Sequence, residues 1–119
     1  MNQEGVFAII LKENNKMIGS VGIINDPKRE NDKARMLGYA MSEKYWGKGI
    51  MTEAVQAVIK YGFNEMKLDL ISAYCYPFNN RSKRVLEKNN FQYEGTLKQA
   101  EKIYNGNIYD NECYILLNK

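Results

Sequence analysis

The chain has 119 residues, of which 45% are hydrophobic and 26% charged, and its formal net charge is +3. This length and composition predict one globular domain, residues 1–119, and exclude a disordered chain, while the small charge selects no class of partner. The chain contains no histidine, which excludes Ser-His and Cys-His catalytic arrangements.

The first third of the chain predicts three strands. Two apolar stretches within residues 5–24 are separated by a polar turn at Glu13–Lys16, which is typical of a hairpin. Residues 34–42, ARMLGYAMS, form the third predicted strand. The apolar run Val6–Leu11 is too short for an export signal or a membrane span, so a cytoplasmic protein without a membrane partner is expected.

A helix is predicted from Ile50 to about Met66, because apolar residues recur there near the 3.6-residue period. Residues 68–76, LDLISAYCY, are rich in strand-forming types and are followed by Pro77. A strand, a helix and a strand between residues 34 and 76 predict a parallel crossover.

Asn79 is the predicted N-cap of a second helix, and Asn89 and Asn90 are expected to end it. Two further strands are predicted over residues 91–99 and 109–117. The fold class is therefore α/β (α+β), with a mixed, mostly antiparallel sheet and two main helices.

The two cysteines, Cys75 and Cys113, lie in apolar strand-like runs without CxxC spacing. Buried, reduced thiols are the expected state of both residues. No metal site is predicted, since neither metal-ligand spacing nor a histidine is present.

The stretch KYWGKGIMTEA, residues 44–54, places Gly47 and Gly49 directly before a predicted helix. The first N–H groups of a helix lack internal partners and attract anions, and glycine lets phosphate oxygens approach the backbone. Lys44 and Lys48 add positive charge, and the hydroxyl of Thr52 is a further donor. Taken alone, the two glycines fit a tight strand-to-helix turn equally well.

Three ordered stretches between residues 34 and 117 resemble the GNAT N-acetyltransferase family, and within it the ribosomal-protein N-terminal acetyltransferase branch. They are YWGKGIMTEA, then NNRSKRVLEKNNF, then YEGTLKQAEKIYNGNIYDNECYILL. The residues in register with the branch are Asn79, Ser82, Leu86, Glu87, Lys88, Phe91, Glu94, Gly95, Leu97, Glu101, Gly106, Tyr109, Asp110 and Tyr114. The resemblance implies the GNAT fold with splayed central strands, and acetyl-CoA as co-substrate.

Three departures from the family pattern stand out. Lys44 replaces the usual Gln or Arg, which keeps the charge but loses a planar donor fork. Met51 replaces a small residue, so the helix is expected to approach a pyrophosphate less closely. Family members also open with a further strand and helices, so this chain is expected to lack them or to receive a cover from another subunit, with a homodimer as one form.

The resemblance also implies roles for individual residues. Ser82 is expected to protonate the CoA sulfur, and Glu101 to polarise a water that takes the proton of the amine. Alternatively, Ser82 is an ordinary serine in the first turn of a helix, and Glu101 is a solvated surface charge. The expected acetyl-CoA contacts are Met41, Ser42, Trp46, Gly47, Lys48, Gly49, Ile50, Met51, Thr52, Asn79, Ser82 and Lys88, with the backbone of Ala40 and with Lys83 as an alternative to Lys88.

Several acceptors and functions remain open at this level. An enzyme acting on a protein N-terminal α-amine is expected first, and one acting on a small amine such as a polyamine or antibiotic second. The third reading is a non-catalytic CoA-binding or interaction module. A nucleic-acid partner is not expected, because no groove-reading or RNA-stacking motif is present.

Overall fold

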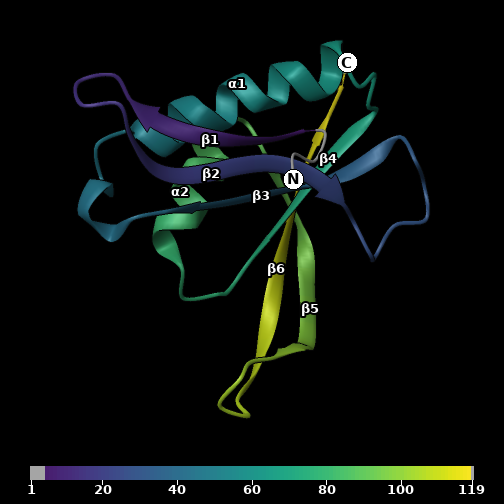
Figure 1. Cartoon of the computed structure of the whole chain (residues 1–119). Helices are drawn as coiled ribbons and strands as arrows, with labels where there is room; N and C mark the ends of the chain where they lie inside the picture. The colour runs from purple at the N-terminus through teal and green to yellow at the C-terminus, as the bar shows by residue number, and fades with distance from the viewer. Residues whose placement is uncertain (1–4, 119) are drawn as a thin grey trace.

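The computed structural model describes residues 5–118 and contains one sheet with two helices packed on it (Figure 1). The elements in chain order are β1 (Val6–Leu11), β2 (Lys16–Asn25), β3 (Ala34–Met41), the 3-10 helix η1 (Glu43–Tyr45), α1 (Ile50–Asn64), β4 (Leu70–Cys75), α2 (Asn80–Lys88), β5 (Gln92–Lys102) and β6 (Ile108–Leu117). All predicted strands and both predicted helices are confirmed, with ends that differ by a few residues. The short helix η1 was not predicted.

The six strands lie in the order β1-β2-β3-β4-β6-β5. β3 and β4 run parallel, as the crossover predicted, and the other neighbouring pairs are antiparallel. The parallel pairing covers only Ala34↔Leu70, Arg35↔Ile71 and Met36↔Ser72. Beyond this point β3 and β4 diverge, which confirms the splayed central strands and leaves the facing edges without ladder partners.

Both helices pack on the same face of the sheet. Alternate residues of β4, namely Ile71, Ala73 and Cys75, point toward Val55 of α1 and Leu86 of α2 in one core cluster. A strand presents every second side chain to the same face, so this alternation fixes which residues meet the helices. Cys75 and Cys113 are both buried free thiols, as predicted.

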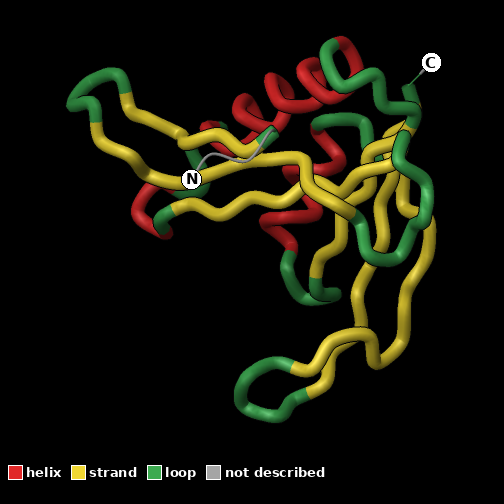
Figure 2. Tube along the Cα trace, turned by 45° about the vertical axis from the view of Figure 1, so that its right-hand side comes forward, coloured by secondary structure: helices red, strands yellow, loops and turns green. Residues whose placement is uncertain are grey.

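β5 and β6 form a long hairpin that projects away from the helices, as two views of the chain show (Figures 1 and 2). The pairing shifts between Leu97 and Glu101, where Gln99 has a φ of 48°. A bulge of this kind increases the local twist and redirects the end of a hairpin.

Within residues 5–118, neither helix has the length and apolar character needed to cross a membrane.

Local sequence explains where α2 begins and ends. The side chain of Asn79 accepts a hydrogen bond from the backbone N–H of Ser82 at 3.0 Å, which confirms the predicted N-cap. Asn89 is the C-cap, and Asn90 follows it with a φ of 68°. Asparagine tolerates this left-handed conformation, as the sequence prediction assumed.

Candidate active site

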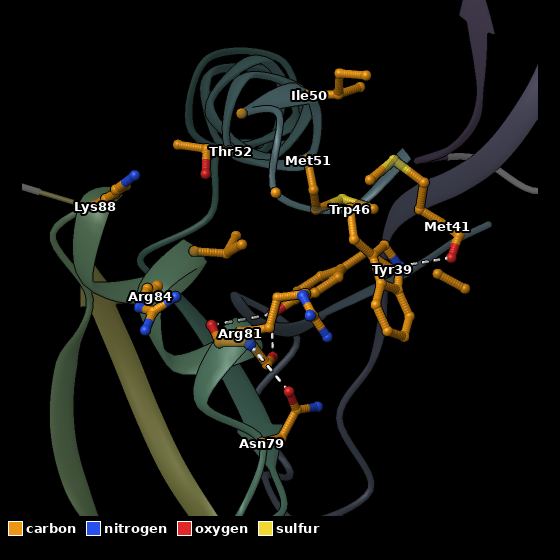
Figure 3. A pocket seen from close by; sticks show the side chains of 15 residues that line it. Tyr39, Met41, Trp46, Ile50, Met51, Thr52, Asn79, Arg81, Arg84 and Lys88 are labelled. Carbon is orange, nitrogen blue, oxygen red and sulfur yellow. Dashed lines mark hydrogen bonds between the residues drawn. The ribbon is translucent and has the colours of Figure 1, made fainter. Parts of the chain in front are cut away.

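A cavity of about 470 Å³ lies between the C-terminal end of β3, the start of α1 and the exposed side of α2 (Figure 3). Its lining residues are Tyr39, Ala40, Met41, Trp46, Gly47, Gly49, Ile50, Met51, Thr52, Asn79, Arg81, Ser82, Arg84, Val85 and Lys88. The volume falls within the range of about 300–1,000 Å³ that is usual for small-molecule sites. The cavity lies beside the part of β3 that has diverged from β4.

The start of α1 supplies unpaired backbone donors to the cavity. Gly49 is the N-cap, with a φ of 78° and no side-chain hydrogen bond to the first turn. Gly47 has the same φ, and a Cβ at either glycine would meet no atom within 4 Å. The glycines therefore give the loop a left-handed backbone and leave space before the first turn, where an anion is favoured.

Basic side chains of α2 line the opposite wall of the cavity. Arg81, Arg84 and Lys88 all belong to this wall, and the guanidinium of Arg81 lies 4.1 Å from the ring centroid of Trp46. The indole N–H of Trp46 donates to the backbone carbonyl of Met41 at 2.9 Å (Figure 3). Trp46 thus links the glycine loop to the end of β3 and to α2.

A pair of hydroxyl groups lies in the cavity wall between β3 and α2. The hydroxyl of Tyr39 is hydrogen-bonded to the hydroxyl of Ser82. Burial raises the pKa of Tyr39, although the hydrogen bond to Ser82 acts in the opposite direction. At neutral pH both groups are protonated, so one hydroxyl donates to the other and the second proton is available to a bound molecule.

The structure brings most of the predicted site residues together. Ten of the twelve predicted acetyl-CoA contacts line the cavity, and only Ser42 and Lys48 do not. The N–H of Ser42 donates to the carbonyl of Ile18 at 2.9 Å. The ammonium of Lys48 lies 5.8 Å from the ring of Tyr45.

The other predicted residues lie outside the cavity wall. Lys83 donates to the carbonyl of Pro77 at 2.5 Å and pairs with Glu112 at 2.6 Å, so its ammonium is held away from the cavity, whereas Lys88 lines it. Glu101 lies on β5, where its carboxylate accepts a hydrogen bond from the hydroxyl of Tyr76 at 2.7 Å.

Sequence reasoning missed three polar residues of the cavity, Tyr39, Arg81 and Arg84. Arg81 and Arg84 are basic residues on α2, and a solvated helix face explains such a pattern equally well. Tyr39 shares the strand parity of Leu37, which predicts that both side chains point toward the helices. No local signal shows that Tyr39 meets Ser82, because 43 positions separate them.

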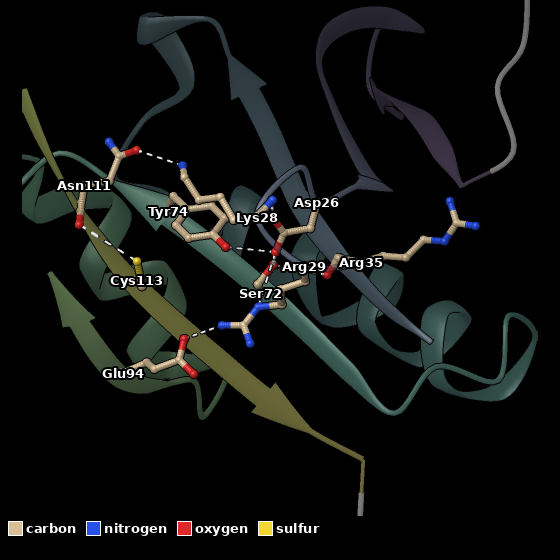
Figure 4. A network of polar contacts seen from close by, with 9 residues as sticks. All are labelled: Asp26, Lys28, Arg29, Arg35, Ser72, Tyr74, Glu94, Asn111 and Cys113. Carbon is tan, nitrogen blue, oxygen red and sulfur yellow. Dashed lines mark hydrogen bonds and ion pairs between the residues drawn. The ribbon is translucent and has the colours of Figure 1, made fainter. Parts of the chain in front are cut away.

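A second polar cluster lies on the other face of the sheet and ties the segment after β2 to β4 (Figure 4). Buried Asp26 accepts hydrogen bonds from the hydroxyls of Ser72 at 2.6 Å and Tyr74 at 2.8 Å, and from the N–H of Lys28 at 2.9 Å. Arg29 lies against Asp26 and pairs with Glu94. Because each partner of Asp26 holds it in place, we assign this cluster a structural role.

The pH dependence of stability is expected to follow Asp26 at low pH and Tyr74 at high pH. Burial would raise the pKa of Asp26, but hydrogen bonds from Ser72, Lys28 and Tyr74 outweigh it and the pKa is lowered. Its stabilising contribution is therefore present above the usual pKa near 3.8 and is lost as the pH falls below it.

Burial and the bond to Asp26 raise the pKa of Tyr74 to about 12, so stability declines between about pH 10 and pH 12. Urea unfolding from pH 2 to pH 12 measures the loss of stability at low pH, here called the acid limb, and the loss at high pH. Asp26→Asn is expected to flatten the acid limb, and an unchanged acid limb would contradict this assignment.

Comparison with known proteins identifies the family. The model of the acetyltransferase (GNAT) domain matches residues 1–92. The chain is 38% identical to the uncharacterized N-acetyltransferase p20 of Bacillus licheniformis over 117 residues, covering 98% of this chain and 64% of that protein. It is also 34% identical over 82 residues to the ribosomal-protein-serine acetyltransferase of Escherichia coli, covering 68% of this chain and 46% of the relative.

Solved structures agree with this assignment. The ribosomal-protein-S5-alanine acetyltransferase from Vibrio fischeri superimposes with a TM-score of 0.86 at 33% identity, covering 96% of this chain and 61% of that one. A spermidine N-acetyltransferase from Vibrio cholerae has a TM-score of 0.81 at 20% identity, which shows a shared fold only. The chain spans about three fifths of the length of p20 and of these two solved structures, and about half the length of the Escherichia coli relative. The chain belongs to the GNAT acetyltransferase family.

Proposed function

We propose that this chain is an N-acetyltransferase that transfers an acetyl group from acetyl-CoA to a primary amine. The observation that carries the proposal is the cavity, in which an uncapped helix N-terminus, two unobstructed glycines and three basic residues of α2 face one another. This donor set fits an elongated ligand that bears phosphates at one end.

The chain's own residues would hold acetyl-CoA as follows. The N–H groups at the start of α1 fit the pyrophosphate, and Arg81, Arg84 and Lys88 fit the remaining phosphate charge. The unpaired edge of β3 beyond Met36 offers backbone groups to the amides of the arm. When bound, acetyl-CoA supplies an activated acetyl group as a thioester.

Transfer to an amine requires two proton movements, and the chain has a candidate for each. The attacking nitrogen forms a bond to the acetyl carbon and must lose a proton, which we assign to a water polarised by Glu101. The carbon–sulfur bond breaks, and the leaving sulfur takes a proton, which we assign to the hydroxyl of Ser82 with Tyr39 as its hydrogen-bond partner. Carboxylates and hydroxyls are the available acid–base groups, because the chain lacks histidine.

For the acceptor we propose a protein N-terminal α-amine. Two relatives above 30% identity, the ribosomal-protein-serine acetyltransferase of Escherichia coli and the ribosomal-protein-S5-alanine acetyltransferase from Vibrio fischeri, are named for a ribosomal-protein acceptor, whereas the spermidine enzyme stands at 20%. Small amines are the competing acceptors in the test that follows.

Two measurements on the purified chain test the proposal. Isothermal titration with acetyl-CoA, and with desulfo-CoA as a second ligand, is expected to give micromolar binding. Thiol release in the presence of acetyl-CoA then compares ribosomal-protein N-terminal peptides with spermidine. Binding without thiol release from any amine would favour a non-catalytic CoA-binding module, and no binding by a folded chain would overturn the proposal.

A further inference from the structure

Asn89 is a buried polar residue that contacts both helices of the cavity without lining it. It is 8% exposed and follows Lys88, the last residue of α2. Lys88 lines the cavity from α2, and Thr52 lines it from the first turn of α1 (Figure 3). Asn89 therefore lies where the end of one cavity wall meets the start of the other.

The side-chain amide of Asn89 joins the two helices. Its nitrogen donates to the carbonyl of Val85 in α2 at 3.0 Å and to the carbonyl of Thr52 in α1 at 3.3 Å. Among the residues that the structure describes, the bond to Thr52 is the one side-chain hydrogen bond between α1 and α2. A buried amide costs free energy unless its donors find acceptors, and here both of its hydrogens have one.

The end of α2 aims this amide. The backbone N–H of Asn89 donates to the carbonyl of Leu86 at 3.1 Å, and the N–H of Asn90 donates to the carbonyl of Glu87 at 3.0 Å. The N–H of Phe91, whose ring is in the core, also donates to Leu86, at 3.0 Å. The backbone is thus fixed on both sides of Asn89, which gives its side chain a defined position.

The other contacts between the helices are apolar. Met51 and Val55 of α1 belong to the same core cluster as Val85 and Leu86 of α2. Burial of apolar surface is non-directional, so it holds the helices together without fixing how one lies along the other. A hydrogen bond has a preferred distance and angle. The bond from Asn89 therefore fixes the first turn of α1 relative to the end of α2.

The two cavity walls carry charge of the same sign. The N-terminus of α1 is the positive end of the helix dipole, and Arg84 and Lys88 line the opposite wall. Without a bound anion these charges repel one another and favour a wider separation of the walls. The bond from Asn89 to Thr52 opposes this separation.

We propose that Asn89 is a positioning residue, which sets the distance between the anion-binding start of α1 and the basic residues of α2 so that one ligand engages both. The proposal rests on the proposed acetyltransferase function, in which α1 holds the pyrophosphate of CoA and α2 the remaining phosphate. Asn89 acts through Thr52 and Lys88. Its loss should therefore reduce the benefit of the second phosphate and leave the first in place.

The first test uses the chain without ligand and compares it with Asn89→Leu, which keeps a side chain of similar size but removes the donors. Amide hydrogen exchange reports on each end of α1. The N–H of Glu53 bonds to the carbonyl of Gly49 at 3.1 Å, and the N–H of Glu65 bonds to that of Tyr61 at 2.8 Å. Exchange at Glu53 is expected to become about tenfold faster, with no change at Glu65.

The second test measures the Kd for CoA and for 3′-dephospho-CoA. The unchanged chain is expected to bind CoA about tenfold more tightly, and Asn89→Leu to reduce this ratio to less than about threefold. A purely structural role would lower stability and leave the ratio unchanged. Asn111→Leu is the matched control, because Asn111 is a buried asparagine whose partners Lys28 and Glu101 lie outside the cavity wall.

Three results would overturn the positioning role. They are unchanged exchange at Glu53, a ratio that Asn89→Leu leaves unchanged, and equal binding of CoA and 3′-dephospho-CoA by the unchanged chain. Asn89→Ala provides the same comparisons if the leucine variant does not fold. Failure of the unchanged chain to bind CoA at all would overturn the proposed function, and exchange at Glu53 would still decide whether Asn89 fixes the start of α1.

Discussion

Replacing Gly47 by leucine is expected to weaken acetyl-CoA binding by at least about 100-fold, because the new side chain would occupy the space in front of α1. The position has no neighbouring atom within 4 Å of an added Cβ, and it lines the cavity. Two charge-assisted hydrogen bonds from the backbone to a phosphate contribute about 3 kcal/mol or more, which corresponds to about 100-fold in affinity. Isothermal titration of the variant with acetyl-CoA measures the effect.

Gly106 offers a matched control for this substitution. It also has a positive φ, of 89°, and an equally open Cβ position, but it lies in the turn between β5 and β6, away from the cavity. A leucine in the left-handed conformation costs about 1–2 kcal/mol at either position. Both variants should therefore lose similar stability in urea unfolding, while only Gly47→Leu loses affinity. Equal affinities of the two variants for acetyl-CoA would show that the loop does not bind the ligand.

Ser82→Ala is expected to lower kcat about 100-fold, with little change in the Kd for acetyl-CoA. General acid catalysis by a positioned side chain contributes about 10²–10⁴-fold. The substitution leaves the helix cap intact, since Asn79 accepts its hydrogen bond from the backbone N–H of Ser82 and not from the hydroxyl. Steady-state thiol release measures kcat, and titration measures the Kd. An unchanged kcat would remove Ser82 from the proton path.

Tyr39→Phe and the double variant separate catalysis from packing. Ser82→Ala leaves the hydroxyl of Tyr39 half-buried with a single long contact, 3.5 Å to the carbonyl of Ser82. An unsatisfied buried hydroxyl costs about 1–3 kcal/mol, which Tyr39→Phe in the same chain should largely restore. If the two hydroxyls act as one unit, the double variant should have the same kcat as Ser82→Ala. If the kcat losses of the two single variants multiply in the double variant, Tyr39 and Ser82 act independently.

Local sequence predicted those parts of the fold that depend on interactions between residues close together in the chain. The helix α1 follows from its apolar period, and the ends of α2 follow from the capping of Asn79 and the left-handed tolerance of Asn90. The hairpin of β1 and β2 follows from two apolar strands around a polar turn. η1 was missed because three residues, Glu43–Tyr45, carry too little periodicity to mark a single turn.

The site was predicted where it consists of one continuous segment, and only in part where it is assembled from several. The loop from Trp46 to Thr52 has backbone donors whatever surrounds it, because a helix that begins there must leave its first N–H groups free. Ser42 was also predicted to contact acetyl-CoA. Its backbone N–H is not free to do so, because it already donates to the carbonyl of Ile18 on β2.

The amino-acid sequence by itself determined the order of the elements, the glycine loop and the family, because these depend on residue types at short spacing. Only the tertiary structure decided the register at which β3 parts from β4, and with it the meeting of Tyr39 with Ser82. It also decided that Lys83 pairs with Glu112 and that Glu101 contacts Tyr76 outside the cavity wall. The physical reason is that such contacts join residues far apart in the chain, and their partners are set by sheet register and helix packing, which no local pattern encodes.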